Sequence, residues 1–176
     1  MPYFYAAGKR VTLTVESSLW ALDTEALAVA LIGESIRKRI LANSRRLRGK
    51  YVLAHVPSSA LESLRAAHAV QPVYRSADAM LVALPEVRVE ESRPETLRRL
   101  RAWIDLRRGS IEVSEAEAGR LTLRPASGDG VEALAIANEL QEEFTPELAE
   151  ARFIRSIEDP NLNLKARIRP HRPNGA

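Results

Sequence analysis

Apolar and polar residues alternate near the start of the chain, which is the period of a β-strand. Within residues 9–22, Val11, Leu13 and Val15 are separated by threonines. β-Branched residues in such an alternation fit a sheet with one buried and one exposed face. The pattern therefore predicts a half-buried strand over residues 9–22.

The apolar spacing then changes to that of a helix. Between residues 25 and 43, leucines and isoleucines recur three and four positions apart, which places them on one helical face. Asp23 or Thr24 is expected to cap the first turn, and Gly33 weakens the middle of this helix. Later in the first half we predict strands at 51–56, 70–74 and 79–84, and a short helix that starts after Pro57.

The second half has the order strand, helix, strand, strand, helix, strand. The predicted strands are 87–90, 111–115, 119–124 and 148–157; one helix runs from Ser92 to Gly109, and the other opens at Asp129 and ends before Pro146. This order is typical of a ferredoxin-like sandwich, an antiparallel sheet with two helices on one face. Pro85 is the expected boundary between the halves. We therefore predict an α+β chain of two small α/β sandwiches, residues 1–85 and the ferredoxin-like 86–158.

Residues 159–176 differ in composition from the rest of the chain. They contain three prolines and four Lys or Arg residues, with no acidic residue after Asp159. This composition predicts an extended basic tail without a core of its own. Polar and apolar residues alternate from Asn161 to Ile168, so this segment could add as a strand to the edge of a partner's sheet.

Composition narrows the class of protein. The chain has 176 residues, of which 45% are apolar and 28% charged, as in ordinary globular domains. The absence of cysteine excludes disulfides and thiolate metal sites. No apolar run approaches the roughly 20 residues that cross a membrane, and the N-terminus lacks the pattern of a secretory signal. We therefore expect a cytoplasmic protein with no membrane partner. Its net charge of +3 is too small to imply a polyanionic partner.

The residues that enzymes need are present but show no recognisable arrangement. The histidines are His55, His68 and His171, and the chain has no Gly-x-Ser-x-Gly motif, no metal-ligand spacing and no glycine-rich phosphate loop. His55 fits a packed or rim position, and His68 fits the end of a helix. We therefore expect no catalytic residue, no metal, no cofactor and no enzymatic activity.

A basic segment between residues 37 and 50 suggests a second kind of partner. Its cations are Arg37, Lys38, Arg39, Arg45, Arg46 and Arg48. Ferredoxin-like sheets also bind RNA, but such platforms stack bases on exposed aromatic residues of the central strands. In the second half Trp103 lies on a helix and Phe153 near the closing strand, and the predicted central strands 87–90 and 119–124 contain no aromatic residue. We therefore interpret the segment as a solvated helix end and turn, and regard nucleic acid as an unlikely partner.

The end of the chain resembles a known family. Ala-Ile-Ala-Asn-Glu-Leu at 135–140, followed by Ala149, Glu150 and Phe153, resembles the end of the propeptide of bacterial subtilisin-like serine proteases. Ala151-Arg152 stands where the family usually has Pro-Asn. The segment around Pro72-Val73-Tyr74, and the aromatic residues before Gly8-Lys9 with Leu13 after them, resemble other parts of these propeptides. No catalytic domain follows the motif in this sequence.

The resemblance implies a ferredoxin-like fold and a function without catalysis. A propeptide-like module binds a subtilisin-like serine protease, in trans or as part of its own precursor, and acts as inhibitor, folding chaperone or both. The residues after the last strand lie in the active-site cleft in the extended form of a substrate. Leu162, Leu164 and Ile168 are then the side chains in the subsites, with Arg167 or Arg169 near a cut point. The whole predicted protease-binding tail comprises Ile157, Leu162, Leu164, Lys165, Arg167, Ile168 and Arg169.

Two other interpretations stay open. In the first, the tail is the cleavage target of an unrelated protease, and the protein is a regulatory switch. In the second, the chain is a ferredoxin-like module that binds RNA or a small effector through residues 37–50. The salt dependence of binding distinguishes the RNA-binding interpretation from protease binding, because contacts to phosphates lose affinity steeply as the salt concentration rises.

Overall fold

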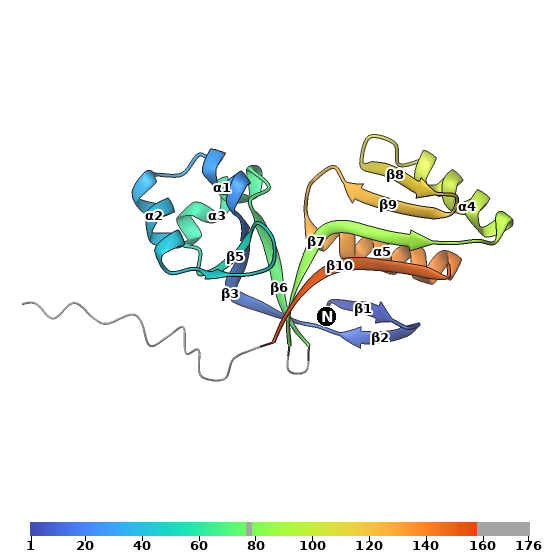
Figure 1. Cartoon of the computed structure of the whole chain (residues 1–176), viewed down its shortest axis with the longest axis horizontal. Coiled ribbons are helices and arrows are strands. Elements are labelled where there is room, and N and C mark those ends of the chain that lie inside the picture. Colours follow the sequence, from blue (N-terminus) through green and yellow to red (C-terminus); the bar gives the residue numbers. More distant parts are fainter. Residues whose placement is uncertain (77–78, 158–176) are drawn as a thin grey trace, which may run out of the picture.

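A largely antiparallel sheet runs through the chain and carries helices along its length (Figure 1). The computed structural model describes residues 1–76 and 79–157 and shows a mixed α+β fold with five helices in that part of the chain. The first half consists of β1 (Tyr3–Ala6), β2 (Lys9–Thr12), β3 (Thr14–Asp23), α1 (Thr24–Val29), α2 (Glu34–Ala42), β4 (Arg45–Arg46), β5 (Tyr51–Ala54), α3 (Ser58–Ala66) and β6 (Val70–Ser76). The second half consists of β7 (Ala79–Glu90), α4 (Pro94–Asp105), β8 (Ile111–Glu117), β9 (Arg120–Pro125), α5 (Gly130–Phe144) and β10 (Leu148–Ile157).

The first predicted strand, residues 9–22, is wrong in its extent, because it is divided at Leu13 into β2 and β3. A hairpin turn precedes β2. β1 and β2 form a separate antiparallel hairpin, and β3 starts only at Thr14. Ala7 and Gly8 both have positive φ, 49° and 74°, as the two residues of a tight hairpin turn require. Between β2 and β3, Leu13 is buried and its N–H donates to the Pro2 carbonyl over 2.9 Å.

The predicted helix over 25–43 is also wrong, since it is broken into α1 and α2. Asp23 caps α1 as expected, its Oδ1 accepting from the N–H groups of Glu25 and Ala26. The break falls before Gly33, which becomes the N-cap of α2. The Arg37 guanidinium donates to the carbonyls of Leu27 and Ala30 and so satisfies groups left without helical partners.

The strands predicted at 79–84 and 87–90 are one strand, β7, that runs through Pro85. β10 pairs with β7 along its length, apart from an irregularity after Ala151. On the opposite edge, β6 pairs with residues 79–82 and β9 with residues 87–90. Pro85 therefore lies where this edge changes partner, and its missing N–H costs no ladder hydrogen bond there. The predicted boundary falls inside a strand, and the division into subdomains stays a prediction.

The core is formed by three clusters. One lies where α4 and α5 pack on β7, β8, β9 and β10, around Leu100, Leu123 and Leu140. A second lies among α1, α2, α3 and their strands, around Leu22 and Leu64. The third joins the two halves on the other sheet face, where Val82 of β7 and Ile154 of β10 meet side chains of β3, β5 and β6.

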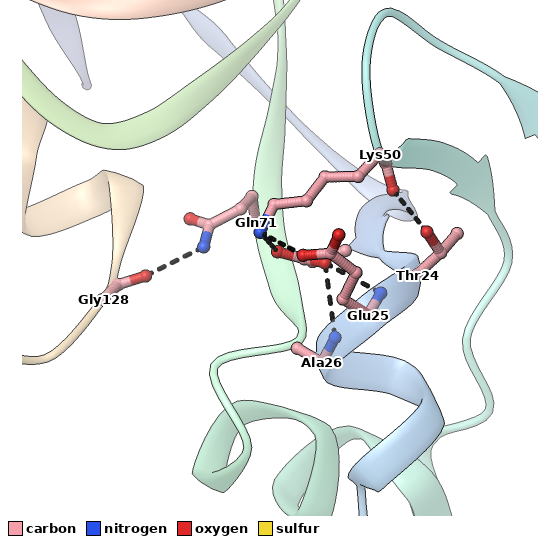
Figure 2. Close-up of polar contacts among 7 residues, drawn as sticks. Thr24, Glu25, Ala26, Lys50, Gln71 and Gly128 are labelled. Atoms are coloured by element: carbon pink, nitrogen blue, oxygen red, sulfur yellow. Dashed lines mark hydrogen bonds and ion pairs between the residues drawn. The ribbon is translucent and has the colours of Figure 1, made fainter.

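Gln71 of β6 connects the first half to the start of α5. Its side chain is buried, its Nε2 donates to the Gly128 carbonyl over 2.8 Å, and its Oε1 accepts from the Gly130 N–H over 2.8 Å. Figure 2 shows the side chain pointing from β6 toward the turn that precedes α5. This one amide fixes the position of the helix that supports β10.

Candidate functional site

The strand that carries the sequence motif, β10, lies at an edge of the sheet. It pairs with β7 on one side, and no other strand of the described chain pairs with it. Ala149 is buried against the helices, Glu150 is exposed opposite Arg88, and Phe153 is half-buried. The motif therefore alternates between the core and the outer face along one edge strand.

Ala151 and Arg152 keep β10 attached to the sheet. Ala151 is buried and pairs with Val87, and the Arg152 guanidinium donates to Glu86 over 2.9 Å. Glu86 also accepts from Arg124 of β9 over 2.9 Å. Partial burial by itself would raise the pKa of Glu86, but the hydrogen bonds from the two arginines hold it below its ordinary value.

The face of β7, β8, β9 and β10 away from the helices is charged, and we call it the open face. Its position follows from strand alternation, because Val87 and Leu123 point into the helix-covered core. Its side chains are Glu86, Arg88, Glu90, Glu112, Ser114, Arg120, Thr122, Arg124, Glu150 and Arg152. Both signs are interspersed and this face has no aromatic side chain, so it fits a charged protein surface better than stacked bases.

The N-terminal hairpin packs against α5 and β10. Phe4 contacts Phe153 with ring centroids 5.1 Å apart, and Asn138 of the Ala-Asn-x-Leu motif donates to the Tyr3 carbonyl over 2.8 Å. The hydroxyls of Tyr3 and Tyr5 both donate to Glu142. These hydrogen bonds lower the pKa of the Glu142 carboxyl. No local pattern predicts this contact, since more than 130 residues separate its two sides.

β10 ends at Ile157, which pairs with Ala79. Beside this end, the Arg45 guanidinium of β4 donates to Ser156 Oγ over 2.6 Å. The other predicted tail residues, Leu162, Leu164, Lys165, Arg167, Ile168 and Arg169, lie outside the described residues. The structure therefore places the end of β10, after which that segment follows in the sequence.

The cations of the predicted basic patch differ in their partners: some are bonded within the fold and others are exposed to solvent. Arg37 is bound to two carbonyls and to Glu34, and Lys38 lies 3.8 Å from the same carboxylate. Arg45 is turned toward β10. Arg39 and Arg46 are exposed, as is Arg48. Arg37 and Arg45 therefore have structural partners, and only part of the segment faces solvent as a free cationic surface.

A polar cluster around Lys50 joins three charged side chains in the first half (Figure 2). Lys50 Nζ lies 2.8 Å from Asp23 Oδ2 and 3.0 Å from Glu25 Oε2. The hydrogen bonds to Asp23 and then Glu25 raise the lysine pKa, so the amine stays protonated. A lysine base or nucleophile needs a lowered pKa, and this cluster instead fastens the start of α1.

The histidines and carboxylates do not converge on a site. His55 Nδ1 lies 2.6 Å from the Ser18 carbonyl, to which it can only donate, and Ser18 Oγ donates to Glu16. His68 lies next to Gly128 and has a positive φ of 52°. Within residues 1–76 and 79–157, no group of three or more His, Cys, Asp or Glu residues could hold a metal ion. His171 lies outside the described part, and the expectation of no enzymatic activity stays a prediction.

Comparison with models of protein families, with curated protein sequences and with solved structures gave no match. Of the helices in the described part of the chain, none is long and apolar enough to cross a membrane.

Proposed function

We propose that the chain is a non-catalytic, propeptide-like module that binds a subtilisin-like serine protease as inhibitor, folding chaperone or both. The observation that carries the proposal is the position of β10. This motif-bearing strand lies at a sheet edge, is fastened by Ala149, Ala151 and Arg152, and leads at Ile157 into the alternating basic segment. An extended segment attached to a rigid sheet is preorganised to enter a cleft, which reduces the entropic cost of binding.

The arrangement of the second half supports this assignment. Its strands follow the order β10-β7-β9-β8 with antiparallel neighbours, and α4 and α5 share one core cluster with them. This strand order and helix placement support a ferredoxin-like arrangement of the second half, which is part of the proposal. Because many unrelated proteins use that fold, the proposal takes its specificity from the β10 motif and the segment after it.

In the proposed complex, two parts of the module act together. The open face, with arginines and glutamates interspersed, docks on a charged surface of the folded protease. The segment after Ile157 lies in the cleft by main-chain pairing, with Leu162, Leu164 and Ile168 in the subsites and Lys165, Arg167 and Arg169 facing outward or near a cut point. Binding only the native protease shifts its folding equilibrium toward the native state, which is the chaperone activity.

No observation favours the RNA or effector module. The open face lacks aromatic side chains for stacking, and Arg37 and Arg45 of the basic segment already have partners in the fold. In the regulatory-switch alternative the same tail also enters a protease cleft. The protease then cuts the tail and releases the cleaved chain, so it is not inhibited. Both alternatives are separated from inhibition by the experiment below.

The test measures residual activity of a panel of subtilisin-like proteases with the intact chain and with a chain truncated after Ile157. Truncation leaves every described element in place, so its circular dichroism spectrum serves as the folding control. We expect inhibition by the intact chain and a loss of at least about 100-fold in inhibitory strength on truncation, as for removal of a main binding segment. Equal inhibition by both forms would show that the tail does not occupy the cleft.

A matched pair of variants tests the proposed subsite residues. Replacing Leu162 and Leu164 together by serine is expected to weaken inhibition, because these side chains share one face of an extended segment. Replacing Asn161 and Asn163 by serine changes the opposite face and is expected to have little effect. Cleavage of the tail without inhibition would support the switch, and absence of both inhibition and cleavage across the panel would reject protease binding.

A further inference from the structure

The second edge of the sheet, β8, has a free backbone at Val113 and an apolar groove beside it. In the described part of the chain β8 pairs with β9 on one side, and on its outer side the Ile111 N–H donates to the Arg107 carbonyl over 3.2 Å. A groove of about 440 Å³ lies between β8 and α4. Ile104, Ile111, Val113 and Leu121 form its apolar part, and the Arg101–Glu115 ion pair lies at its rim. Val113 is 44% exposed although its register partner Leu123 is fully buried, so the helices do not fully cover this face of the sheet at β8.

The backbone groups of Val113 point away from the sheet. The Ala126 N–H donates to the Ser110 carbonyl over 2.8 Å. Because bonded and non-bonded pairs alternate along an antiparallel ladder, the even-numbered residues that follow Ser110 turn their backbone groups toward β9. Val113 is odd-numbered, so it presents its N–H and C=O at the free edge. An incoming strand can therefore form ladder hydrogen bonds with β8 around Val113 and Glu115, between the bonded Ile111 and the irregularity after Glu115.

The charge of β8 selects the kind of strand that fits. Its sequence, Ile-Glu-Val-Ser-Glu-Ala-Glu, has three glutamates and no cation. Glu112 has no ion-pair partner within the described residues, whereas Glu117 is paired with Arg120. Acidic residues at an edge repel acidic strands, and pairing with a neutral strand would desolvate their charges without a compensating cation, so they protect against indiscriminate pairing. A basic strand with apolar residues at every second position is the partner that this edge accepts.

The chain itself contains such a segment after its last described strand. From 161 to 169, Leu162, Leu164, Ala166 and Ile168 share one face of an extended segment, and Lys165, Arg167 and Arg169 share the other. Beside β8, the apolar face would cover the groove, and the basic face would extend the open face next to Glu112. Both faces of the segment therefore match the edge.

The segment cannot lie along its full length beside β8 of its own molecule. Ile157 pairs with Ala79, whereas Val113 is aligned with Val87, eight residues farther along β7 and on the opposite side. The separation is roughly 30 Å from about 3.3 Å per residue along a strand and about 4.8 Å between strands. Residues 158–161 span less than roughly 17 Å when fully extended, so residue 161 cannot reach the start of β8. A segment that pairs over its full length therefore comes from a second copy.

We propose that residues 161–169 of one copy add as a strand to β8 of another copy. Reciprocal exchange of the segments between two copies gives a closed dimer, and one-way addition gives longer assemblies. This self-association does not depend on the proposed protease binding. If both occur, they compete for the same segment, so a protease releases the copies from one another.

The test uses full-length variants and measures molar mass by light scattering. The parent chain is expected to reach at least twice its monomer mass of 19.5 kDa as concentration rises. Val113→Pro removes the outward N–H of the edge, and Leu164→Asp puts a charge on the apolar face of the segment; each variant alone is expected to stay monomeric. Mixing the two should restore association, because one supplies an intact segment and the other an intact edge.

The controls separate edge blocking from misfolding and from failure of the proposed function. Val113→Thr keeps the N–H and should associate like the parent chain, and Glu112→Lys, at an exposed position, should weaken association about 10-fold by opposing the basic segment. A monomeric parent chain, or a mixture of the two variants that stays monomeric while both are folded, would overturn the proposal. Protease inhibition by folded Val113→Pro reports separately on the proposed function.

Discussion

The side-chain oxygen of Gln71 accepts a 2.8 Å hydrogen bond from the backbone N–H of Gly130, and this contact ties β6 to the first turn of α5. The same amide donates to the Gly128 carbonyl. A helix N-terminus leaves several N–H groups without helical partners. Here a side chain from the other half of the chain satisfies one of them, in a site from which water is excluded.

Gln71→Ala is expected to lower the free energy of unfolding by about 1–3 kcal/mol, because it leaves buried backbone groups without partners. Urea denaturation measures the loss. Gln141→Ala, in the last turn of the same helix α5 and only half-buried, is the matched control and should change stability by less than about 0.5 kcal/mol. An equal loss in both variants would show that the Gln71 contact has no special role.

Gly130→Ala is expected to destabilise the fold through a steric clash. A Cβ at this position would lie 2.1 Å from the Ala83 carbonyl oxygen, so α5 must shift on β7 at a cost of about 1–3 kcal/mol or more. In Gly33→Ala, the closest neighbour of the new methyl group is Ser35 Oγ at 4.0 Å. Thermal unfolding of the two variants should show a clear difference in midpoint.

Glu91→Gln is expected to reduce the dependence of stability on pH. Glu91 is buried and accepts from the Arg93 guanidinium through both oxygens, and these hydrogen bonds lower its pKa from the ordinary 4.5. A carboxyl with a lowered pKa in the folded state contributes stability above its unfolded pKa and loses that contribution as pH falls. The variant should therefore be less stable than the parent near neutral pH, and the difference should shrink below about pH 4.

The urea midpoints of both proteins across this pH range test the prediction. Glu95→Gln, an exposed carboxyl in the first turn of α4, is the control for loss of one negative charge near the same helix. A difference between parent and Glu91→Gln that stays constant with pH would contradict the assigned ion pair.

Arg88→Glu is expected to weaken protease inhibition about 10-fold or more without loss of stability, since Arg88 lies exposed on the open face. Arg98→Glu makes the same charge change on α4, on the opposite side of the sheet. Inhibition constants of the two variants locate the docking surface. A larger effect of Arg98→Glu would place it on the helices instead.

Much of the second half could be predicted from the sequence because its signals are local. Asp129 accepts from the Val131 N–H and starts α5, Pro94 lies in the first turn of α4, and β10 occupies the predicted 148–157. Each of these depends on residues within a few positions of the element that they define.

The errors occur where distant contacts decide the structure. The strand β7 continues through Pro85 because its partner on one edge changes from β6 to β9 there, which only the assembled sheet determines. The break between α1 and α2 is stabilised by the Arg37 side chain. The Asn138–Tyr3 contact could not be predicted, since nothing in the local pattern links the two ends of the chain. The motif strand was found, but its edge position required the structure.

The pairing of β10 with β7 along most of its length also governs the order in which the chain can fold. Because β10 is the last described element to be synthesised, the largest set of long-range pairings waits until residue 157 is available. Such a topology has a high contact order and slows folding. A nascent chain that stops before Leu148 presents the apolar strand β7 with one edge bare. Incomplete products of translation should therefore aggregate, whereas the finished strand closes that edge.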